Sequence, residues 1–548
     1  MSMLPKSSLR GRDLALSLLA AALLLFPALG QTPFRRAEIY FADAARAMVE
    51  RGDWIVPYFR GVPFFDKPAL TYWLFAASFK VFGFSTGAAR VAPAIATLLV
   101  IAATAWISRL LWQDRASALA AGWVLIATVP FMTFGSIAMS DMLLTLWTTL
   151  AMALGILCYR SERPPSLAIV TLAAVLGLGF LTKGPIALVI PGLGLLCILW
   201  EQRRRLPRIS IPTILVSALV FFPVALGWFA VVYLRMGIEP ITFFFVRENL
   251  QRFSGAAHDV GRPAWFYLAT YFGQGAPWSL LLPLAALQLL RRQPDAGGRI
   301  LILWMVLVGG LLTLSHGKVD YYLLPLYPAA ALLVGRYLSI VVWTRIERRF
   351  VGLLLGLVGA ALVLLPIPMM RMPIEWRPHG FAMFGVALAL VVAGGACLAA
   401  TLRPRPATAL QAFVFSLWLS YGVVNVYILP AFYAAQPNAA LIAAASRERM
   451  LRPALAVAAH EDPTQLHRDL LFYSRLVVEE SNDLQSLALS PKPYLLLANP
   501  AEAEMLKATA QVREIGSYRY LSLRFFTLRG VFDEPVPERL VLLANFDF

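Results

Sequence analysis

The sequence predicts an α-helical polytopic membrane protein with a small α/β domain outside the membrane. Hydrophobic residues make up 59% of the 548 residues and only 14% are charged, whereas a soluble domain would have about 25% charged residues. The mean hydropathy of +0.69 agrees with that assignment. The composition changes after Pro430, where short alternating stretches replace the long apolar segments. These observations exclude an ordinary soluble enzyme and indicate two structural regions.

About 13 apolar segments are long enough to cross a bilayer, which needs roughly 20 residues per helix. We therefore expect about 13 transmembrane helices. The first segment follows Lys6, Arg10 and Arg12 and is interpreted as a retained signal anchor, since no convincing cleavage site follows it. The predicted segments are 14–31, 88–110, 116–135, 142–159, 166–182, 185–200, 212–233, 268–290, 299–314, 320–342, 350–370, 380–402 and 409–432.

The basic residues between these segments predict the orientation. Thirteen crossings put six basic clusters on the same side as the N-terminus, which the positive-inside rule identifies as the cytoplasm. The segment 69–82 is apolar but short and contains Lys80, and a crossing there would invert every later cluster. We expect it to lie in the interface as an amphipathic helix. The clusters begin at Arg109, Arg160, Arg203, Arg291, Arg345 and Arg403.

Two domains are predicted from this topology. Residues 1–432 form the transmembrane domain, with a long catalytic loop at 32–87 on the outer face. Residues 433–548 form a soluble extracytoplasmic α/β domain, because apolar stretches such as YLLLANP and RLVLLANF alternate with a helical segment at Ala501–Thr509.

The loop that contains FRRAEIYFADAARAMVERGDWIVPYFRGVPFFDKPALTYW is too polar for the membrane and too aromatic for disorder. Helical periodicity covers Ala37–Glu50, and Gly52 should end that helix. Pro57, Gly61 and Pro63 predict an irregular turn. Pro68 then begins the interfacial helix. We interpret this loop as the floor of an active site at a membrane surface.

Several functions are excluded or disfavoured by composition. The net charge of +17 could suggest nucleic acid, but the basic excess lies in topology-setting loops. Cys158, Cys197 and Cys397 all lie in apolar runs, which leaves no disulfide framework or metal motif. The sequence contains no Walker motif and no GxGxxG motif, so it offers no nucleotide-binding site for ATP-driven transport.

Two carboxylates stand at span ends on the predicted outer face. Glu38 opens the first loop helix and Asp141 begins a transmembrane segment. Each could simply stabilise a helix N-terminus, by its charge or as an N-cap. Because both lie at one membrane face, we predict that they converge as catalytic residues. Paired carboxylates suit sugar transfer through a cationic transition state.

Four cations also lie on the outer face, against the usual charge bias. Lys67 stands in an aromatic, proline-bracketed turn, Lys183 interrupts an apolar run, and Arg252 and Lys318 lie in later loops. Such residues can be interfacial anchors or turn markers. Together they predict a binding site for an anionic substrate in the outer leaflet. Asp66 and His258 could share a divalent metal such as zinc, although a lone loop histidine usually has no special role.

The motifs as a set resemble the lipid-linked sugar transferases of the GT-C fold, in particular the undecaprenyl-phosphate aminoarabinose transferases. The resemblance rests on AEIYFADAARAMVERGDWIVP, FDKPALTYW, the SDM acid, LTKGP, VRENLQRF and HGKVDYYLLPLYP. By this resemblance Glu38 matches the second acid of the family's Asp-Glu pair, and Ala37 replaces the first. Asp141 matches the acid that follows the third span of the family, and Lys67 matches the family's phosphate-facing lysine. Polar positions around the same cavity match Arg252, His258, Lys318 and Tyr322.

The resemblance implies transfer of 4-amino-4-deoxy-L-arabinose from undecaprenyl phosphate to a lipid A phosphate. It implies a bacterial inner-membrane enzyme with its N-terminus in the cytoplasm and its active site in the periplasm, which confers polymyxin resistance. No cofactor would be required. An O-mannosyltransferase-like enzyme with a Ser/Thr acceptor is the alternative. A flippase or transporter is disfavoured, because midspan positions are almost wholly apolar.

Overall fold

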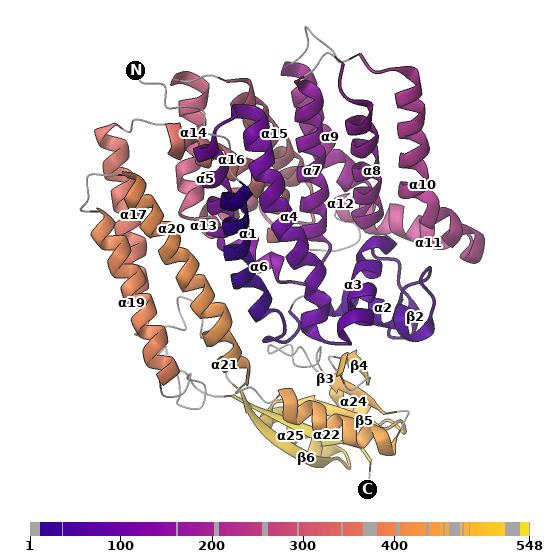
Figure 1. Ribbon diagram of the computed structural model, residues 1–548. Helices are drawn as coiled ribbons and strands as arrows, with labels where there is room; N and C mark the ends of the chain where they lie inside the picture. Colours follow the sequence, from indigo (N-terminus) through magenta and orange to yellow (C-terminus); the bar gives the residue numbers. More distant parts are fainter. Residues whose placement is uncertain are drawn as a thin grey trace. The chain divides into compact units, whose positions relative to one another are not determined.

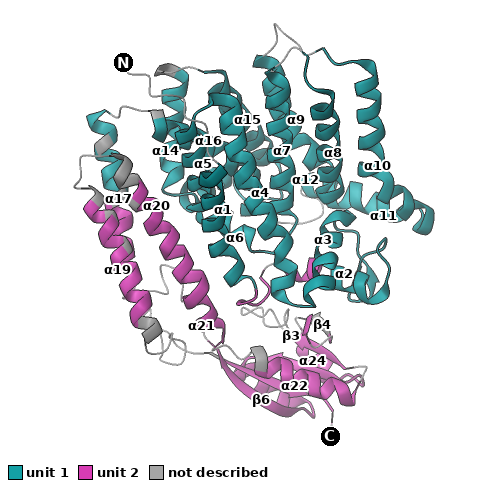
Figure 2. Ribbon diagram, viewed as in Figure 1, with its two compact units in different colours: residues 1–29, 44–354 teal, residues 30–43, 355–548 magenta. Residues whose placement is uncertain are grey.

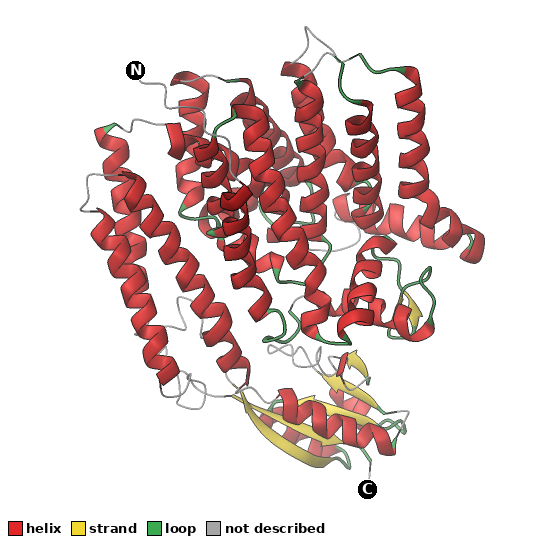
Figure 3. Ribbon diagram, viewed as in Figure 1, coloured by secondary structure: helices red, strands yellow, loops and turns green. Residues whose placement is uncertain are grey.

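The computed structural model is predominantly helical, and the strands among its described residues form one hairpin and one sheet (Figures 1 and 3). It describes residues 11–35, 37–160, 163–201, 208–254, 261–292, 295–340, 344–364, 381–401, 406–434, 438–452, 455–459, 472–473, 476–481, 483–520 and 538–546.

The chain divides into two compact units (Figure 2). The first contains Met1–Leu29 and Ala44–Leu354, and the second contains Gly30–Asp43 and Leu355–Phe548. The candidate site described below lies within the first unit.

Most helices of the first unit follow the predicted apolar segments, but the predicted segments 116–135 and 268–290 are each divided into two helices, and only 327–340 of the predicted segment 320–342 is α-helical. By length and composition, seven helices of the described chain could cross a membrane, or eight if α5 and α6 form one span bent by 69°. The expected number of 13 crossings therefore stays a prediction. The helices are α1 (Gly11–Leu25), α4 (Thr86–Trp112), α5 (Arg115–Ile126), α6 (Val129–Gly135), α7 (Asp141–Tyr159), α8 (Ser166–Lys183), α9 (Ile186–Glu201), α10 (Ile211–Met236), α13 (Phe266–Gln274), α14 (Trp278–Leu287), α15 (Ala296–Leu314), α16 (Tyr327–Ile340) and α17 (Arg345–Leu364), the last of which continues into the second unit.

Small and hydroxyl-bearing residues allow these helices to pack closely. A Cβ atom on Gly335 of α16 would lie 2.5 Å from the backbone nitrogen of Ala121 in α5, so only glycine fits there. Buried threonines are satisfied within their own helices: Thr104 donates to the Val100 carbonyl at 2.7 Å, and Thr149 to the Thr145 carbonyl at 2.7 Å. These two threonines are thus buried in the bundle with their hydroxyl groups paired to the backbone of their own helices.

The predicted catalytic loop contains α2 (Glu38–Arg51), a hairpin and α3 (Ala69–Phe82). Gly52 ends α2 with a φ of +70°, as expected. The expectation of an irregular turn was wrong: β1 (Tyr58–Phe59) and β2 (Val62–Pro63) pair antiparallel. Arg60 and Gly61 both have positive φ, the geometry of a tight two-residue hairpin turn. Pro68 directly precedes α3 as its N-cap rather than standing in its first turn.

Tryptophan hydrogen bonds fix this loop to the helices. Trp228 of α10 donates to the Ile55 carbonyl at 2.8 Å, and Trp73 of α3 donates to the Trp54 carbonyl at 2.6 Å. Phe65 is buried in an apolar cluster with Trp228 and with Phe180 of α8. Because Asp66 and Lys67 follow Phe65 directly, the cluster positions them against the helix ends.

The loop 234–267 contains a segment that sequence reasoning did not assign to a helix. After α11 (Glu239–Thr242), residues Phe243–Gln251 form a π-helix of nine residues, which continues into α12 (Arg252–Ser254). A π-helix of this length is rare, and π-helical turns concentrate at functional sites.

The second unit contains membrane-type helices that include α19 (Phe381–Thr401), α20 (Pro406–Val423) and a π-helix (Val424–Ile428), followed by α21 (Leu429–Ala434) and α22 (Asn438–Leu451). Glycines permit the close approach of α17 and α19, since a Cβ on Gly359 would lie 2.9 Å from the Gly394 carbonyl oxygen.

The predicted C-terminal α/β region has a five-stranded sheet in the order β4-β3-β5-β7-β6. Its strands β3 (Ala456–Ala459), β4 (Val477–Glu480) and β5 (Tyr494–Ala498) are parallel, and β7 (Glu538–Ala544) and β6 (Arg513–Tyr520) join antiparallel. Helices α24 (Leu484–Ala488) and α25 (Pro500–Thr509) pack on it. A capping box between Asn499 and Glu502 starts α25, close to the expected 501–509. Strand β3 was not predicted.

Candidate active site

A pocket of about 120 Å³ lies in the first unit where the ends of α7, α8 and α15 meet the π-helix and the Lys67 loop. Its lining combines polar and apolar side chains. The polar lining residues are Lys67, Asp141, Lys183, Glu248, Asn249, Arg252, Ser315, Tyr321 and Tyr322, and the apolar ones include Leu144, Ile186, Ile190, Phe244, Leu311 and Leu312.

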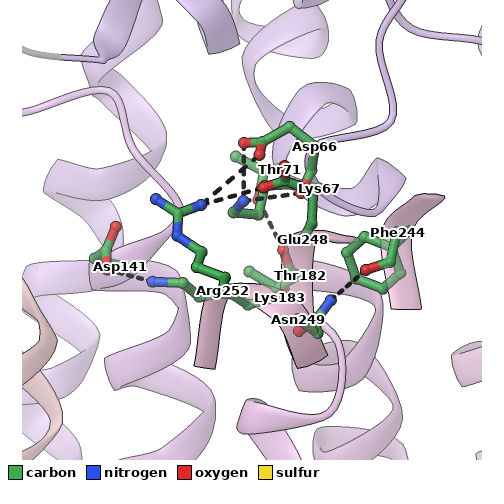
Figure 4. Close-up of polar contacts among 10 residues, drawn as sticks. All are labelled: Asp66, Lys67, Thr71, Asp141, Thr182, Lys183, Phe244, Glu248, Asn249 and Arg252. Atoms are coloured by element: carbon green, nitrogen blue, oxygen red, sulfur yellow. Dashed lines mark hydrogen bonds and ion pairs between the residues drawn. The ribbon is translucent and has the colours of Figure 1, made fainter. Parts of the chain in front are cut away.

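Two acids and two cations form what we call the loop group: Asp66, Lys67, Glu248 and Arg252 (Figure 4). Lys67 Nζ lies 2.8 Å from Asp66 Oδ2 and also donates to the Asp66 carbonyl. Arg252 Nη1 lies 3.2 Å from Glu248 Oε2 and 4.0 Å from Asp66 Oδ1. The side chains of Lys67 and Arg252 retain 13% and 30% exposure. Both cations are therefore held in place and still accessible to a ligand.

The two acids of the loop group differ in protonation. Burial and the adjacent Asp66 carboxyl raise the pKa of Glu248 from 4.5 to about 7. Burial opposes ionisation of Asp66 too. The positive charge of Lys67, a hydrogen bond with Glu248, and the positive charge of Arg252 outweigh burial and hold the pKa of Asp66 well below its usual 3.8. Near neutral pH the group consequently contains two cations, one carboxylate and one carboxyl that is close to half protonated.

Asp141 and Lys183 form what we call the helix-end pair. Asp141 is the first residue of α7 and Lys183 the last of α8, and Lys183 Nζ bonds Asp141 Oδ1 directly. The side chains are only 4% and 8% exposed. Lys183 Nζ also lies 4.9 Å from the centroid of the Tyr322 ring. The N-cap of α7 is Ser140, so Asp141 faces a buried cation rather than capping its helix.

Lys318 lies beside the pocket rather than in its wall. It is buried, and its Nζ donates to the Ser315 carbonyl at 2.5 Å. Ser315 itself lines the pocket, as does Tyr322. Of the five predicted substrate-binding residues, the pocket thus brings together Lys67, Lys183, Arg252 and Tyr322, and Lys318 supports its rim.

Glu38 belongs to the second unit. It is fully buried, and its Oε2 accepts a hydrogen bond from the Arg35 backbone N–H at 2.5 Å. The predicted convergence of Glu38 and Asp141 stays a prediction, since the two acids lie in different units.

His258 lies outside the described residues, so the predicted metal site at Asp66 and His258 stays a prediction. Within the described ranges, no three His, Cys, Asp or Glu side chains are grouped to hold a metal ion. The Asp66 carboxylate is engaged with Lys67 and Arg252.

Sequence reasoning missed Glu248 and Asn249. Both occur in VRENLQRF, from which only Arg252 was selected. Glu248 stands four residues before Arg252, the spacing at which helical side chains of opposite charge meet. That spacing was a usable signal for Glu248, but nothing in the sequence indicated the π-helix.

The fold is that of solved membrane transferases. The chain aligns with the crystal structure of ArnT from Cupriavidus metallidurans bound to undecaprenyl phosphate, with a TM-score of 0.71, 19% identity and coverage of 98% of this chain and 97% of the other. The apo form of the same protein gives a TM-score of 0.72 at 20% identity, with the same coverage. The predicted fold class, a GT-C glycosyltransferase fold in an α-helical polytopic membrane protein with a C-terminal α/β region, is confirmed.

Sequence comparison is more specific. The family model for dolichyl-phosphate-mannose-protein mannosyltransferase matches residues 29–236. An undecaprenyl phosphate-alpha-4-amino-4-deoxy-L-arabinose arabinosyl transferase of Pseudomonas aeruginosa (strain LESB58) is 33% identical over 414 residues, which cover 73% of this chain and 71% of the relative. The chain therefore belongs to the undecaprenyl phosphate-aminoarabinose arabinosyl transferase family. The prediction of a glycosyltransferase that depends on a lipid-linked sugar is confirmed.

Proposed function

We propose that this protein transfers 4-amino-4-deoxy-L-arabinose from undecaprenyl phosphate to a phosphate of lipid A. The observation that carries the proposal is the lining of the pocket, which combines the cations Lys67 and Arg252 with several apolar side chains. A polyprenyl phosphate combines an anionic head and an apolar chain in the same way. Family membership supports the choice of sugar and carrier.

The residues suit the chemistry of a leaving phosphate. As the glycosidic bond breaks, negative charge develops on the carrier phosphate, and partly exposed Lys67 and Arg252 would stabilise it. The acceptor phosphate is already ionised, so the transfer needs no strong general base. The cations thus carry most of the proposed catalysis.

The carboxylates have a different task in this proposal. Asp141 would hold Lys183 at the pocket wall and present a negative potential to the sugar, whose amino group and anomeric carbon carry positive charge. Glu38 would act from the outer loop on the acceptor or the sugar ammonium. A metal at Asp66 and His258 would join two outer loops, 32–87 and 234–267, and the transfer would not require it.

The enzyme would operate in the bacterial inner membrane with its pocket and C-terminal region in the periplasm. Adding a cationic sugar to lipid A lowers the negative charge of the outer surface. Cells would consequently bind less polymyxin and other cationic peptides.

Mass spectrometry of lipid A from cells that express the wild-type chain tests the proposal. We expect aminoarabinose-modified lipid A with the wild type, none with Lys67→Ala, and normal modification with Lys80→Ala. Lys80 is a matched control because it stacks on Trp54, 5.2 Å from the ring centroid, outside the pocket wall. Glycosylated periplasmic protein with unmodified lipid A would instead indicate an O-mannosyltransferase-like acceptor.

A further inference from the structure

The π-helix Phe243–Gln251 contributes much of the pocket. Phe244, Glu248 and Asn249 line it from this segment, and Arg252 and Phe253 follow directly. A π-helix is bonded from residue i to i−5 and is normally less favourable than an α-helix. Its persistence over nine residues needs local interactions that favour the wider turn.

Asn249 supplies one such interaction. Its side-chain Nδ2 donates to the Phe244 carbonyl at 2.7 Å, five residues earlier. That spacing is the repeat of the π-helix itself. Asparagine is a poor residue for a helix interior because its amide competes for backbone groups. Here that competition reinforces the π geometry instead of ending the helix.

Phe244 is fixed at the other end of this bond. A Cβ atom on Gly184 would lie 2.6 Å from Phe244 Cζ, so the ring packs directly on the C-terminus of α8. Phe244 is 3% exposed, and its ring centroid is 5.5 Å from that of Phe229 in α10. The Asn249 bond therefore connects the pocket side of the π-helix to a rigid point beside Lys183.

We propose that Asn249 is a positioning residue which, by holding Phe243–Gln251 in the π-helical form, places Arg252 and Glu248 against Asp66 and Lys67. Removing the extra residue from one turn would rotate everything after it by about 100°, the angle per residue of an α-helix. Arg252 Nη1 could not then keep its distances of 3.2 Å to Glu248 and 4.0 Å to Asp66. The inference rests on the proposed function only in its activity readout.

The test is a double-mutant cycle on the full-length protein, with undecaprenyl phosphate binding and transfer measured separately. Asn249→Asp keeps the shape but replaces the donor with an acceptor that faces the Phe244 carbonyl. We expect about tenfold weaker binding of undecaprenyl phosphate and a raised KM for the lipid-linked donor. If Asn249 acts through Arg252, the same change in an Arg252→Ala background should weaken binding less than about twofold further.

Asn425→Asp is the matched control. Asn425 lies in the second unit, where its Nδ2 donates to the Tyr421 carbonyl at 3.1 Å, and it does not line the pocket. It should leave binding and transfer unchanged. Equal losses from Asn249→Asp in both backgrounds, or normal binding by the single variant, would overturn the proposal. A wild-type chain that binds undecaprenyl phosphate but transfers no aminoarabinose would overturn the proposed function alone, and the binding cycle would still decide the role of Asn249.

Discussion

The loop group and the helix-end pair line the same pocket but hold their charges differently. The loop group is built on irregular backbone and a π-helix, and its cations are 13% and 30% exposed. The helix-end pair sits on the termini of two helices, and its members are 8% and 4% exposed. Lys183 is paired with Asp141 and lies over the Tyr322 ring, so its charge is already compensated.

This difference indicates that the loop group binds the anionic ligand, whereas the charges of the helix-end pair balance each other. An anion can approach Lys67 and Arg252 because the side chains of both cations remain partly exposed. An anion could reach Lys183 only by breaking a buried ion pair, which costs several kcal/mol when one partner is left alone. We therefore expect the carrier phosphate to bind the loop group and the helix-end pair to set the shape and field around it.

The largest expected effect is at Lys67. Lys67→Ala removes the more buried of the two ligand-facing cations and should lower transfer by at least about 10²-fold, the usual scale for a positioned charge. Lys67→Arg keeps the charge but changes its geometry and should be impaired as well. Thermal melting should stay near the wild type, because Lys67 lies in a loop. Transfer by Lys67→Ala within about twofold of the wild type would refute a role in phosphate binding.

Asp141→Asn should lower both the stability and the activity of the protein. It leaves the Lys183 ammonium buried without its counter-charge, which typically costs about 3 kcal/mol or more. We expect a clearly lower melting temperature and transfer reduced by about 10²-fold. The double variant Asp141→Asn, Lys183→Gln removes both charges and should recover the melting temperature but not the activity. A melting temperature equal to that of the wild type in the single variant would mean that the pair contributes no stability.

Gly184 joins the two groups, and Gly184→Ala should have an intermediate effect. The backbone φ of +71° disfavours any side chain by roughly 1 kcal/mol. The new methyl group would also press on Phe244 and displace the π-helix. We expect transfer to fall about tenfold with a modest loss of stability. Gly309→Ala is the control, because a Cβ there meets nothing within 4 Å, and it should behave as the wild type. Equal activity of the two variants would exclude the coupling.

The sequence predicted the helices well because apolar length and glycine stops are local signals. Gly52 ends α2, and α3 covers the expected 69–82. Several site residues were also identifiable from sequence alone. Lys67, Lys183 and Arg252 were selected because they stand on the face that basic residues normally avoid, and all three line one pocket.

The pairings could not be predicted, because they join residues far apart in the chain. Asp141 was expected to converge with Glu38, but within the first unit its partner is Lys183, 42 residues away. The hairpin at Arg60 and Gly61 was also missed. Its turn needs a positive φ at both residues, and an arginine seldom adopts a positive φ, so the sequence did not indicate this turn. The π-helix that brings Glu248 into the site could not be predicted either, because its pattern of polar and apolar residues does not differ from that of a polar loop.

The smallest expected effect is a pH dependence that isolates Glu248. Its pKa is raised from 4.5 to about 7 in the folded protein, so between these values the native state binds a proton that the unfolded state has released. Stability contributed by this group is therefore present below about pH 4.5 and is lost as the pH rises toward 7. Glu248→Gln resembles the protonated form at every pH. We expect the melting temperature of the wild type relative to Glu248→Gln to fall between pH 5 and pH 7.5 in detergent, by a few degrees at most.

The Glu248→Gln variant should bind undecaprenyl phosphate about as tightly as the wild type at pH 5.5, where the wild-type carboxyl is mostly protonated. At pH 8 the wild type carries an additional negative charge beside Arg252, so the variant should bind the phosphate several-fold more tightly. A difference in melting temperature that is constant across this range would show that Glu248 titrates like an exposed carboxylate. The loop group would then be held by two full ion pairs, like the helix-end pair, and its advantage in binding an anion would have to come from exposure alone.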